Sequence, residues 1–577
     1  MLRFKTPRDF IAAGTVILVF VILFTSHLRF REQINASWLY SANQKSQTAP
    51  SKSDAWIRTQ AATAGVISND RKAVNHAHEW TITHTVLSVS TTTATATVTP
   101  TPTKLGLPPV YYAKPGEDAF CKHQYSTQYL YNLASNRSQI CTPDSTSSLT
   151  CFTTNIQSEF ETREGKVDIF CSAENVAFSR KQKMFYMDCK LTEEGENIFA
   201  HMEEYMFWTG PRHQFDEHFN LNASVHFMQV ASELRQGHET AIAMRREGAG
   251  SKPGCACNTW HNLMEVWSYY MSMDVLSITP DEHEPHGTTM FDMEKDVANN
   301  QIIVLDKHER GPYFDLYNLL SDTNKHPHMW VQNDLANSTF EGLRWYDQVV
   351  VPLAGNTNPF WEGTWKSHPC ADSTLAKTFH RRVLDVFGLE KIPTLAPITE
   401  QPVLAKTATP PPWPEIQDLD TRINVTIVDR KETRKIANLE DQFIPRIEAK
   451  YPQVDITVID FGSIPFREQV ELAYFSDVFV GVHGAAMTHI MFLPTASPTR
   501  PASNVVEITP RGIHHRGYRN LAQALGHRYF TVDADNDLNG ADFHDVDVVV
   551  SEEKFLDAVG TAIRAALQKG MRDGSIE

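Results

Sequence analysis

The chain has 577 residues, of which 41% are hydrophobic and 21% are charged, and this composition is typical of globular proteins. Its length allows several domains with buried cores. The formal net charge of -16 argues against a general nucleic-acid binder, because contacts with a phosphate backbone need clustered Lys and Arg side chains.

The N-terminus contains an uncharged apolar segment, residues 10–26, with basic residues on both sides. Its length is at the short end of the roughly 17–25 residues that span a bilayer. No small-residue cleavage pattern follows it, which argues against a removed signal peptide. We therefore expect a single-pass membrane anchor preceded by a cytosolic tail, residues 1–9. The basic residues on both sides leave its orientation to other evidence.

Cysteines and glycosylation sequons provide that evidence. All eight Cys residues follow the apolar segment. Sequons of the form N-x-S/T occur at Asn35, Asn136, Asn222, Asn337 and Asn424. Sequons also arise by chance, and the cysteines could be buried thiols. Together with the anchor, they favour a disulfide-bonded body in the lumen of the Golgi or the endoplasmic reticulum, that is, a type II membrane protein.

Residues 27–108 are predicted to be a stem, because their Ser/Thr/Pro-rich sequence has too few large apolar residues to form a core. Residues 109–390, which begin with a Cys-rich region, are predicted to be a first α/β domain on the acceptor side. The expected strands are 166–178, 183–191, 300–306 and 346–355, and the expected helices are 258–278, 312–322 and 373–389.

A Pro-rich segment, residues 391–418, is predicted to link this domain to a second one, residues 419–577. Strands are expected at 423–429, 454–461, 478–483, 504–510 and 528–533, with helices at 439–451, 466–476, 485–492, 518–526 and 552–570. Regular alternation of apolar strands with helices indicates a parallel, doubly wound sheet. Such sheets bind ligands at the carboxyl ends of their strands.

Several polar residues are predicted to lie at that edge. His483 and Gly484 end the third strand, where a glycine turn and the start of a helix can bind an anion. The same turn could instead serve close packing of strand and helix. Arg430 and Arg434 follow the first strand, and guanidinium groups suit a diphosphate, although surface ion pairs are the competing interpretation. Glu507, near the end of the fourth strand, could bind ribose hydroxyls or cap a helix.

Five segments resemble glycosyltransferase family 61. They are "DVFVGVHGAAMTHIMFLP", "VDRKETRKI", "VVEITP", "NTWHNLMEVWSYYMSMDVL" and "PYFDLYNLLSD". The resemblance covers about residues 200–535. One departure is Ala486-Met487, where the family usually has Gly-Leu. The resemblance implies a GT-B fold with two Rossmann-like domains. It also implies inverting transfer of a sugar, xylose or N-acetylglucosamine, from UDP to a glycan or glycoprotein hydroxyl, with no essential metal.

On this resemblance, Arg430, Arg434 and the 483–484 turn would hold the diphosphate and Glu507 the ribose. Thr488 is a further candidate contact to the nucleotide-sugar. Inverting transfer needs a base for the acceptor hydroxyl. His261 and Glu265 are the candidates, because they are four residues apart and so share one helical face. The alternative is that the two form a pair that only braces the helix.

Two other functions stay open at this stage. The chain could be an inert luminal protein that binds a glycan or nucleotide without turning it over. It could also be a metal-dependent GT-A transferase that uses Asp533-Ala534-Asp535 as its metal-binding triplet, although this triplet follows the last strand of the sheet. An EF-hand is excluded there, because Leu538 occupies the position that requires glycine.

Overall fold

The computed structural model describes residues 117–567 in one compact unit, Val98–Glu577. Within this range it leaves out 155–166, 203–207, 248–255, 282–287, 294, 323, 332–341, 391–421, 498–499 and 537–545. The predicted cytosolic tail, membrane anchor, stem and Pro-rich linker lie outside the described residues. Among the residues that are described, no helix has the length and apolarity needed to cross a membrane.

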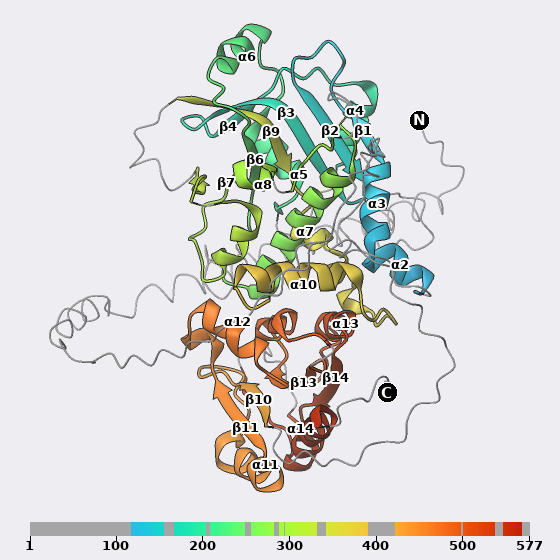
Figure 1. The fold of residues 1–577 in the computed structure, drawn as a ribbon, viewed down its shortest axis with the longest axis vertical. Helices are drawn as coiled ribbons and strands as arrows, with labels where there is room; N and C mark the ends of the chain where they lie inside the picture. Colours follow the sequence, from blue (N-terminus) through green and yellow to red (C-terminus); the bar gives the residue numbers. More distant parts are fainter. Residues whose placement is uncertain are drawn as a thin grey trace, which may run out of the picture. The chain divides into compact units, whose positions relative to one another are not determined.

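The C-terminal lobe is built on a parallel five-stranded sheet with the order β11-β10-β12-β13-β14 (Figure 1). The chain passes from β10 to β11 on one side and then returns to place β12 on the other side of β10. The carboxyl ends of β10 and β12 therefore form a topological switch point. The strands are β10 (Ile423–Val428), β11 (Val454–Ile459), β12 (Val478–Val482), β13 (Asn504–Thr509) and β14 (Arg528–Asp533). All five strands predicted from the sequence are present.

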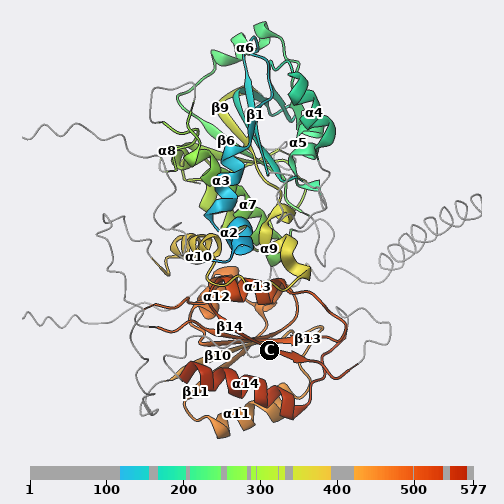
Figure 2. The same ribbon diagram turned by 90° about the vertical axis from the view of Figure 1, so that its right-hand side faces the viewer.

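Helices cover both faces of this sheet, as expected for a doubly wound fold (Figure 2). Because side chains alternate along a strand, Val480 packs with the helices of one face and Phe479 with those of the other. One face carries η8 (Leu439–Phe443), α11 (Ile444–Lys450) and α14 (Glu552–Leu567). The other carries α12 (Phe466–Tyr474), η10 (Ala485–Phe492) and α13 (Gly517–Ala524).

Two of these segments differ in helix type from the prediction. The expected helix 439–451 begins as a π-helical turn, η8, and becomes α-helical at the junction that holds Pro445. Proline is tolerated in a first turn, where its missing N–H has no helical partner. The expected helix 485–492 is a 3-10 helix, η10.

The N-terminal lobe contains a nine-stranded mixed sheet whose main order is β1-β2-β3-β9-β6-β7-β8. Strands β9, β6, β7 and β8 run parallel, whereas β1, β2, β3 and β9 pair antiparallel. The sheet thus has a parallel part and an antiparallel extension. The family resemblance implied a second Rossmann-like domain here but did not imply this extension. The strands are β1 (Arg137–Gln139), β2 (Ser148–Thr153), β3 (Ile169–Ser179), β4 (Met184–Tyr186), β5 (Phe219–Asn220), β6 (Thr240–Met244), β7 (Asn300–Val304), β8 (Met329–Trp330) and β9 (Leu343–Val351).

The central helix of this lobe is α7 (Thr259–Ile278), and nearly all of its side chains are buried. A helix that is covered on nearly every side belongs in a core, and the polar side chains buried on α7, such as Glu265 and Asp274, have partners there. The expected helix 312–322 is a 3-10 helix, η4 (Phe314–Leu320). The other helices are α2 (Ala119–Tyr125), α3 (Thr127–Ser135), α4 (Glu193–His201), α5 (Pro211–His218), α6 (Val225–Ser232), α8 (Lys295–Asn299), η6 (Gly355–Thr357), α9 (Pro359–Glu362), η7 (Gly363–Trp365) and α10 (Thr374–Val386).

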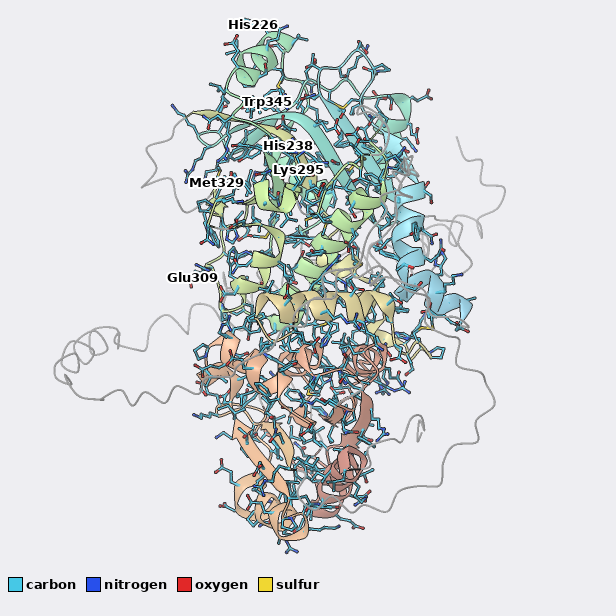
Figure 3. All side chains as sticks on the ribbon, in the orientation of Figure 1. His226, His238, Lys295, Glu309, Met329 and Trp345 are labelled. Carbon is cyan, nitrogen blue, oxygen red and sulfur yellow. A yellow bond between two sulfur atoms is a disulfide. The ribbon has the colours of Figure 1, made fainter. Side chains whose placement is uncertain are left out.

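One continuous apolar core joins the two lobes. It contains Phe379 of α10, Met487 of η10 and Leu521 of α13. Figure 3 shows side chains filling the layer between α10 and the helices of the C-terminal lobe. Backbone contacts reinforce it, because the Ser373 N–H donates to the Ala524 carbonyl at 2.7 Å. The lobes therefore pack against each other through an apolar layer with backbone hydrogen bonds across it.

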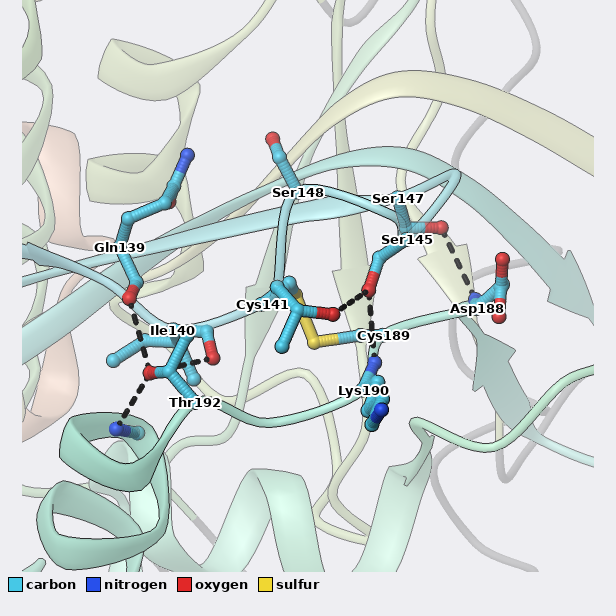
Figure 4. Close-up of a disulfide and its surroundings, with 12 residues drawn as sticks. Gln139, Ile140, Cys141, Ser145, Ser147, Ser148, Asp188, Cys189, Lys190 and Thr192 are labelled. Carbon is cyan, nitrogen blue, oxygen red and sulfur yellow. Dashed lines mark hydrogen bonds between the residues drawn. A yellow bond between two sulfur atoms is a disulfide. The ribbon is translucent and has the colours of Figure 1, made fainter.

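The even number of cysteines is explained by disulfides in the N-terminal lobe. The bonds are Cys121–Cys370, Cys141–Cys189 and Cys151–Cys171. Figure 4 shows Cys141–Cys189 among the hydroxyl groups of its neighbours. Cys257 is also disulfide-bonded, and the described residues include no free cysteine. The expectation of a disulfide-bearing body is thus confirmed.

A buried ion pair between α7 and α10 generates a prediction about stability. Arg382 donates two hydrogen bonds to Asp274, at 2.7 and 2.9 Å, and both side chains are at most 10% exposed. Asp274→Ala leaves the guanidinium buried without its counter-ion, so we expect it to lower the free energy of unfolding by about 3–5 kcal/mol.

Chemical denaturation of the purified protein measures this change. The matched control is Asp216→Ala, which removes the more exposed partner of Arg212 and should cost less than about 1 kcal/mol. Equal losses for the two variants would contradict the interpretation.

Candidate functional site

The switch point of the C-terminal sheet brings together two segments that are far apart in the sequence. Val428 of β10 pairs with Gly481 of β12, so the residues after both strands emerge at the same edge. There the Nη1 group of Arg434 donates a hydrogen bond to the carbonyl oxygen of His483 at 3.1 Å. Arg434 is buried, and its backbone is left-handed with φ of 60°. The structure thus places the predicted arginine on the predicted turn.

Gly484 is required at this turn for two reasons. Its φ of 148° with ψ of -178° lies in a backbone region that essentially only glycine adopts. A Cβ atom at this position would also overlap the guanidinium of Arg434. The glycine therefore allows the arginine to lie directly against the backbone of the turn.

The departure from the family pattern at Ala486-Met487 has a packing explanation. Met487 is fully buried, and a Cβ atom on Gly481 would meet its sulfur. The thioether thus occupies the space above the glycine of β12, and the apolar character of η10 is kept.

His483 is held by Glu507 from the neighbouring strand. The Nδ1 atom of the imidazole lies 2.7 Å from the Glu507 carboxylate, and both side chains are at most 8% exposed. The pairing follows from the register, since Gly481 lies opposite Glu507 in the β12–β13 ladder. A carboxylate accepts from Nδ1–H and so fixes the ring orientation. Glu507 therefore contacts His483, a role that neither sequence interpretation of it, ribose binding or helix capping, included.

Two aromatic rings of the C-terminal lobe contact His483, and two tryptophans of the N-terminal lobe contact those rings. The rings of His515 and Tyr518 each lie 5.2 Å from it, and Trp260 of α7 lies 5.2 Å from Tyr518. Trp365 of η7 contacts His515 at 5.4 Å, and 70% of its surface is exposed. Sequence reasoning did not select these residues. The segment "GIHHRGYRN" does follow the carboxyl end of the fourth strand, and that position was the available signal.

Burial affects two of these groups directly. It lowers the pKa of His515 to about 4, with smaller contributions from His483 and Arg516, so that this imidazole is neutral at physiological pH. Burial also raises the pKa of Tyr518, and an interaction with the Thr488 hydroxyl offsets part of that rise. Thr488 is fully buried in η10. The side chain faces the interior beside Tyr518, and its contact with a nucleotide-sugar stays a prediction.

Arg430 lies beside the N-terminal lobe. Burial raises the pKa of Tyr313, while a hydrogen bond with Thr259 and the positive charge of Arg430 lower it. Arg430 is therefore close enough to Tyr313, the residue before η4, to act on it electrostatically. The two predicted arginines thus take different places, Arg434 inside the turn and Arg430 on the side of the opposite lobe.

Glu265 does not occupy the position expected of a catalytic base. Its carboxylate is almost fully buried and accepts the Gly355 N–H at 3.0 Å. Burial is the main cause that raises its pKa to about 8. A Cβ atom on Gly355 would overlap this carboxyl group. Glu265 therefore anchors the turn of η6 in the core, and its role as an acceptor base stays a prediction.

His261 pairs with a different glutamate from the one the helical spacing suggested. Its Nδ1 atom contacts the carboxylate of Glu247, and its ring lies 4.5 Å from that of Trp361. Glu247 follows the carboxyl end of β6, a parallel strand, and this position could have identified it from the sequence. The idea of a His261–Glu265 pair that braces α7 is therefore wrong, because each residue has another partner.

The acidic triplet after β14 has a structural role. The Asp535 carboxylate accepts the Ser551 N–H at 2.5 Å and pairs with Lys554 in the first turn of α14. The hydrogen bond from Lys554 lowers the pKa of Asp535. Within the described residues, no three His, Cys, Asp or Glu side chains are grouped as metal ligands would be.

The turn geometry predicts a specific cost of replacing Gly484. Gly484→Ala adds backbone strain of about 1–3 kcal/mol and forces the new methyl group against Arg434. Gly512→Ala is a matched control, because Gly512 also has a positive φ, of 81°, but has open space around it. Thermal and denaturant unfolding should show the larger loss for Gly484→Ala, and equal losses would contradict the close contact with the guanidinium.

The buried carboxyl of Glu265 predicts a pH dependence of stability. Its pKa rises from 4.5 to about 8 on folding, so between these values the folded state keeps a proton that the unfolded state releases. The free energy of unfolding must then fall as the pH rises through this window. We expect a shallower fall in Glu265→Gln and an unchanged one in Glu233→Gln, which alters an exposed carboxylate. Denaturant titrations at a series of pH values measure the slope, and identical slopes in all three proteins would contradict the assignment.

Comparisons with known proteins match this part of the chain. A family model described as Glycosyltransferase 61 matches residues 346–500, which include Arg430, Arg434, His483 and Gly484. The EGF domain-specific O-linked N-acetylglucosamine transferases of Xenopus laevis and Mus musculus are 35% and 30% identical over 115 residues. The Drosophila melanogaster protein of the same name is 28% identical over 111 residues.

Each alignment covers 19% of this chain and 20% of the relative, so the chain matches about a fifth of the length of these curated relatives. The matched region contains the switch-point turn, whereas His261 and Glu247 lie outside the family model. Residues 346–500 are therefore a glycosyltransferase 61 domain by this match, and the similarity is shown over that part of the chain.

Proposed function

We propose that this protein is an inverting glycosyltransferase that moves a sugar from UDP to a hydroxyl group of a glycan or glycoprotein in the secretory pathway. The observation that carries the proposal is the Arg434 guanidinium held against the His483-Gly484 turn at the switch point. Open parallel sheets bind nucleotides at this place. The match to glycosyltransferase 61 over the same residues supports it.

In this proposal the diphosphate of the donor lies at the turn. Arg434 and Arg430 supply fixed positive charge, and guanidinium forks suit phosphate oxygens better than a point charge does. Negative charge grows on the UDP leaving group as the bond to the sugar breaks. Preorganised positive groups stabilise that charge more in the transition state than in the ground state, which is the condition for catalysis.

His483 and Glu507 act as a unit in this proposal. Glu507 accepts from Nδ1, so the other ring nitrogen, Nε2, is the atom that we assign to a diphosphate oxygen. Glu507 thus positions His483, and the ribose contact expected for it is not part of the proposal. Tyr518 and His515 pack beside the imidazole and limit its rotation.

The donor sugar is proposed to be N-acetylglucosamine or xylose. The relatives named above are N-acetylglucosamine transferases specific for EGF domains, as their names state, and the similarity covers a fifth of their length. Two lobes that share one core, with the diphosphate turn in the C-terminal lobe, fit a GT-B arrangement. No essential metal is part of the proposal, so activity should persist with excess EDTA, and its loss would favour a metal-dependent GT-A transferase.

We further propose that the body lies in the lumen of the Golgi or the endoplasmic reticulum behind the N-terminal anchor. The disulfides suit an oxidising compartment. The sequon residues Asn136, Asn222 and Asn424 are exposed, as a glycan acceptor must be. Sensitivity to glycosidases together with protection from protease in intact membranes tests this, and an unglycosylated, protease-accessible body would contradict it.

The proposed diphosphate site predicts the effect of removing its arginine. Arg434→Ala loses charge-assisted hydrogen bonds worth about 1.5–3 kcal/mol, so we expect the affinity for UDP to fall by about 10- to 100-fold. Arg446→Ala is the control, because Arg446 lies in α11, where it pairs with Glu552 on the opposite face of the sheet. Isothermal titration with UDP measures both.

Donor turnover separates the enzyme from an inert binding protein. Release of UDP from UDP-N-acetylglucosamine and UDP-xylose should be detectable for the wild type and strongly reduced in Arg434→Ala and His483→Ala. Binding of UDP without any release would favour the inert protein. Unchanged affinity and turnover in both variants would contradict the site.

A further inference from the structure

The N-terminal lobe contains a histidine–carboxylate pair that the nucleotide site described above does not use. The Nδ1 atom of His261, in the first turn of α7, contacts the carboxylate of Glu247. The Glu247 side chain is 3% exposed and that of His261 is 17% exposed. A buried carboxylate thus lies beneath an imidazole that keeps part of its surface open. Histidines that transfer protons commonly have a carboxylate beside one ring nitrogen, and this carboxylate orients the ring.

The residue that precedes His261 packs against the rings that contact His483. Trp260, the residue before His261, packs 5.2 Å from Tyr518 and 6.2 Å from His515 of the C-terminal lobe. Successive residues of a helix differ by only about 1.5 Å in height, so the imidazole is at the same level of α7 as this contact. The N-terminal end of α7 is therefore the part of the first lobe that meets the switch-point turn.

A second segment holds the imidazole from its other side. The ring of Trp361, in α9, lies 4.5 Å from that of His261. The residues that follow are hydrogen-bonded to the C-terminal lobe, because Asn520 donates to the Gly363 carbonyl at 3.1 Å and to the Lys366 carbonyl at 2.8 Å. The Arg516 N–H also donates to the Thr364 carbonyl. The position of His261 is thus tied to the lobe that carries the turn.

The geometry points to His261 as the base that accepts the proton of the attacking hydroxyl group. Glu247 is the residue that positions the imidazole and balances the charge that forms on it. This inference rests on the proposed function, because it assigns the second half of the same reaction. It replaces the His261–Glu265 combination suggested by helical spacing. Glu265 is not part of the inference, because its carboxylate lies in the core on the Gly355 N–H.

The proton and electron balance of the step is simple. The hydroxyl oxygen forms a bond to the anomeric carbon as the bond from that carbon to the diphosphate oxygen breaks, and its electron pair leaves with UDP. The hydroxyl proton passes to Nε2 of His261. The ionised Glu247 carboxylate beside Nδ1 balances the positive charge that forms on the ring. UDP leaves as an anion held by the arginines of the other lobe.

The titratable groups around the pair decide how the step depends on pH. Glu265 of α7 and Tyr317 of η4 both interact electrostatically with Glu247. Burial raises the pKa of Glu247 to about 9 and lowers that of His261 to about 3. Near neutral pH the pair therefore holds a proton that it must lose before His261 can act as a base. Turnover should then rise with pH up to about 9.

The test measures UDP release from the preferred donor, UDP-N-acetylglucosamine or UDP-xylose, between about pH 5.5 and pH 9.5. Base catalysis contributes about 10²–10⁴-fold, so His261→Ala should lower kcat by at least about 100-fold while the Kd for UDP stays within about 3-fold of wild type. Glu247→Gln should lower kcat by about 10- to 100-fold and remove the rise with pH, because the imidazole then lacks its carboxylate. Glu247→Asp should keep part of that rise.

Controls come from another histidine–glutamate pair of the same lobe. His218 and Glu217 of α5 lie 3.9 Å apart, and His218→Ala and Glu217→Gln should leave kcat and its pH profile unchanged. Retained UDP affinity shows that each variant is folded. The inference is overturned if Glu247→Gln and His261→Ala bind UDP and keep the wild-type kcat and pH profile. A wild-type protein that neither binds UDP nor releases it from either donor contradicts the proposed function itself.

Discussion

The candidate site depends on one contact, the guanidinium of Arg434 against the carbonyl oxygen of His483. A buried cation needs polar partners, and the backbone of the turn supplies one only because Gly484 has no Cβ atom in the way. This requirement connects the first and third strands of the C-terminal sheet at the point where its strand order reverses. Positive charge is therefore fixed at the edge of the sheet before any ligand arrives, so little reorganisation is needed on binding.

Neighbouring side chains connect to this contact through a hydrogen bond and through packing of aromatic rings. Glu507, one strand away, holds the His483 imidazole, and Tyr518 and His515 pack against its ring. Burial keeps His515 neutral, so its ring packs beside His483 without adding a positive charge there. Trp260 brings the N-terminal lobe to the same rings. The arrangement therefore has a charged centre for an anion and an aromatic wall shared between the lobes.

The shared core explains how groups from separate lobes keep their places. Apolar side chains of α10, η10 and α13 form one cluster, and hydrogen bonds to the 363–366 segment cross the same boundary. Two lobes joined by a mobile hinge alone would leave the distance between Glu247 and the switch point undefined. Packing of this kind fixes α7, and with it His261, relative to the turn. In the proposed reaction, donor binding and proton removal would fall to different lobes of one compact unit.

The amino-acid sequence by itself determined the C-terminal sheet and the edge on which Arg434 and the His483-Gly484 turn meet. The periodicity of apolar residues identifies strands and helices, and parallel sheets bind ligands at the carboxyl ends of their strands. Both inferences need only the local pattern of residues, which a single sequence contains. Only the tertiary structure decided the partners of individual side chains. Helical spacing favoured a His261–Glu265 pair, but α7 is buried on nearly all sides, so each face meets a different element and each residue takes its partner from there. The same reason applies to three residues that the sequence did not single out, Glu247, His515 and Trp260. Their contacts join residues that are far apart in the chain, and packing of the whole core brings such residues together.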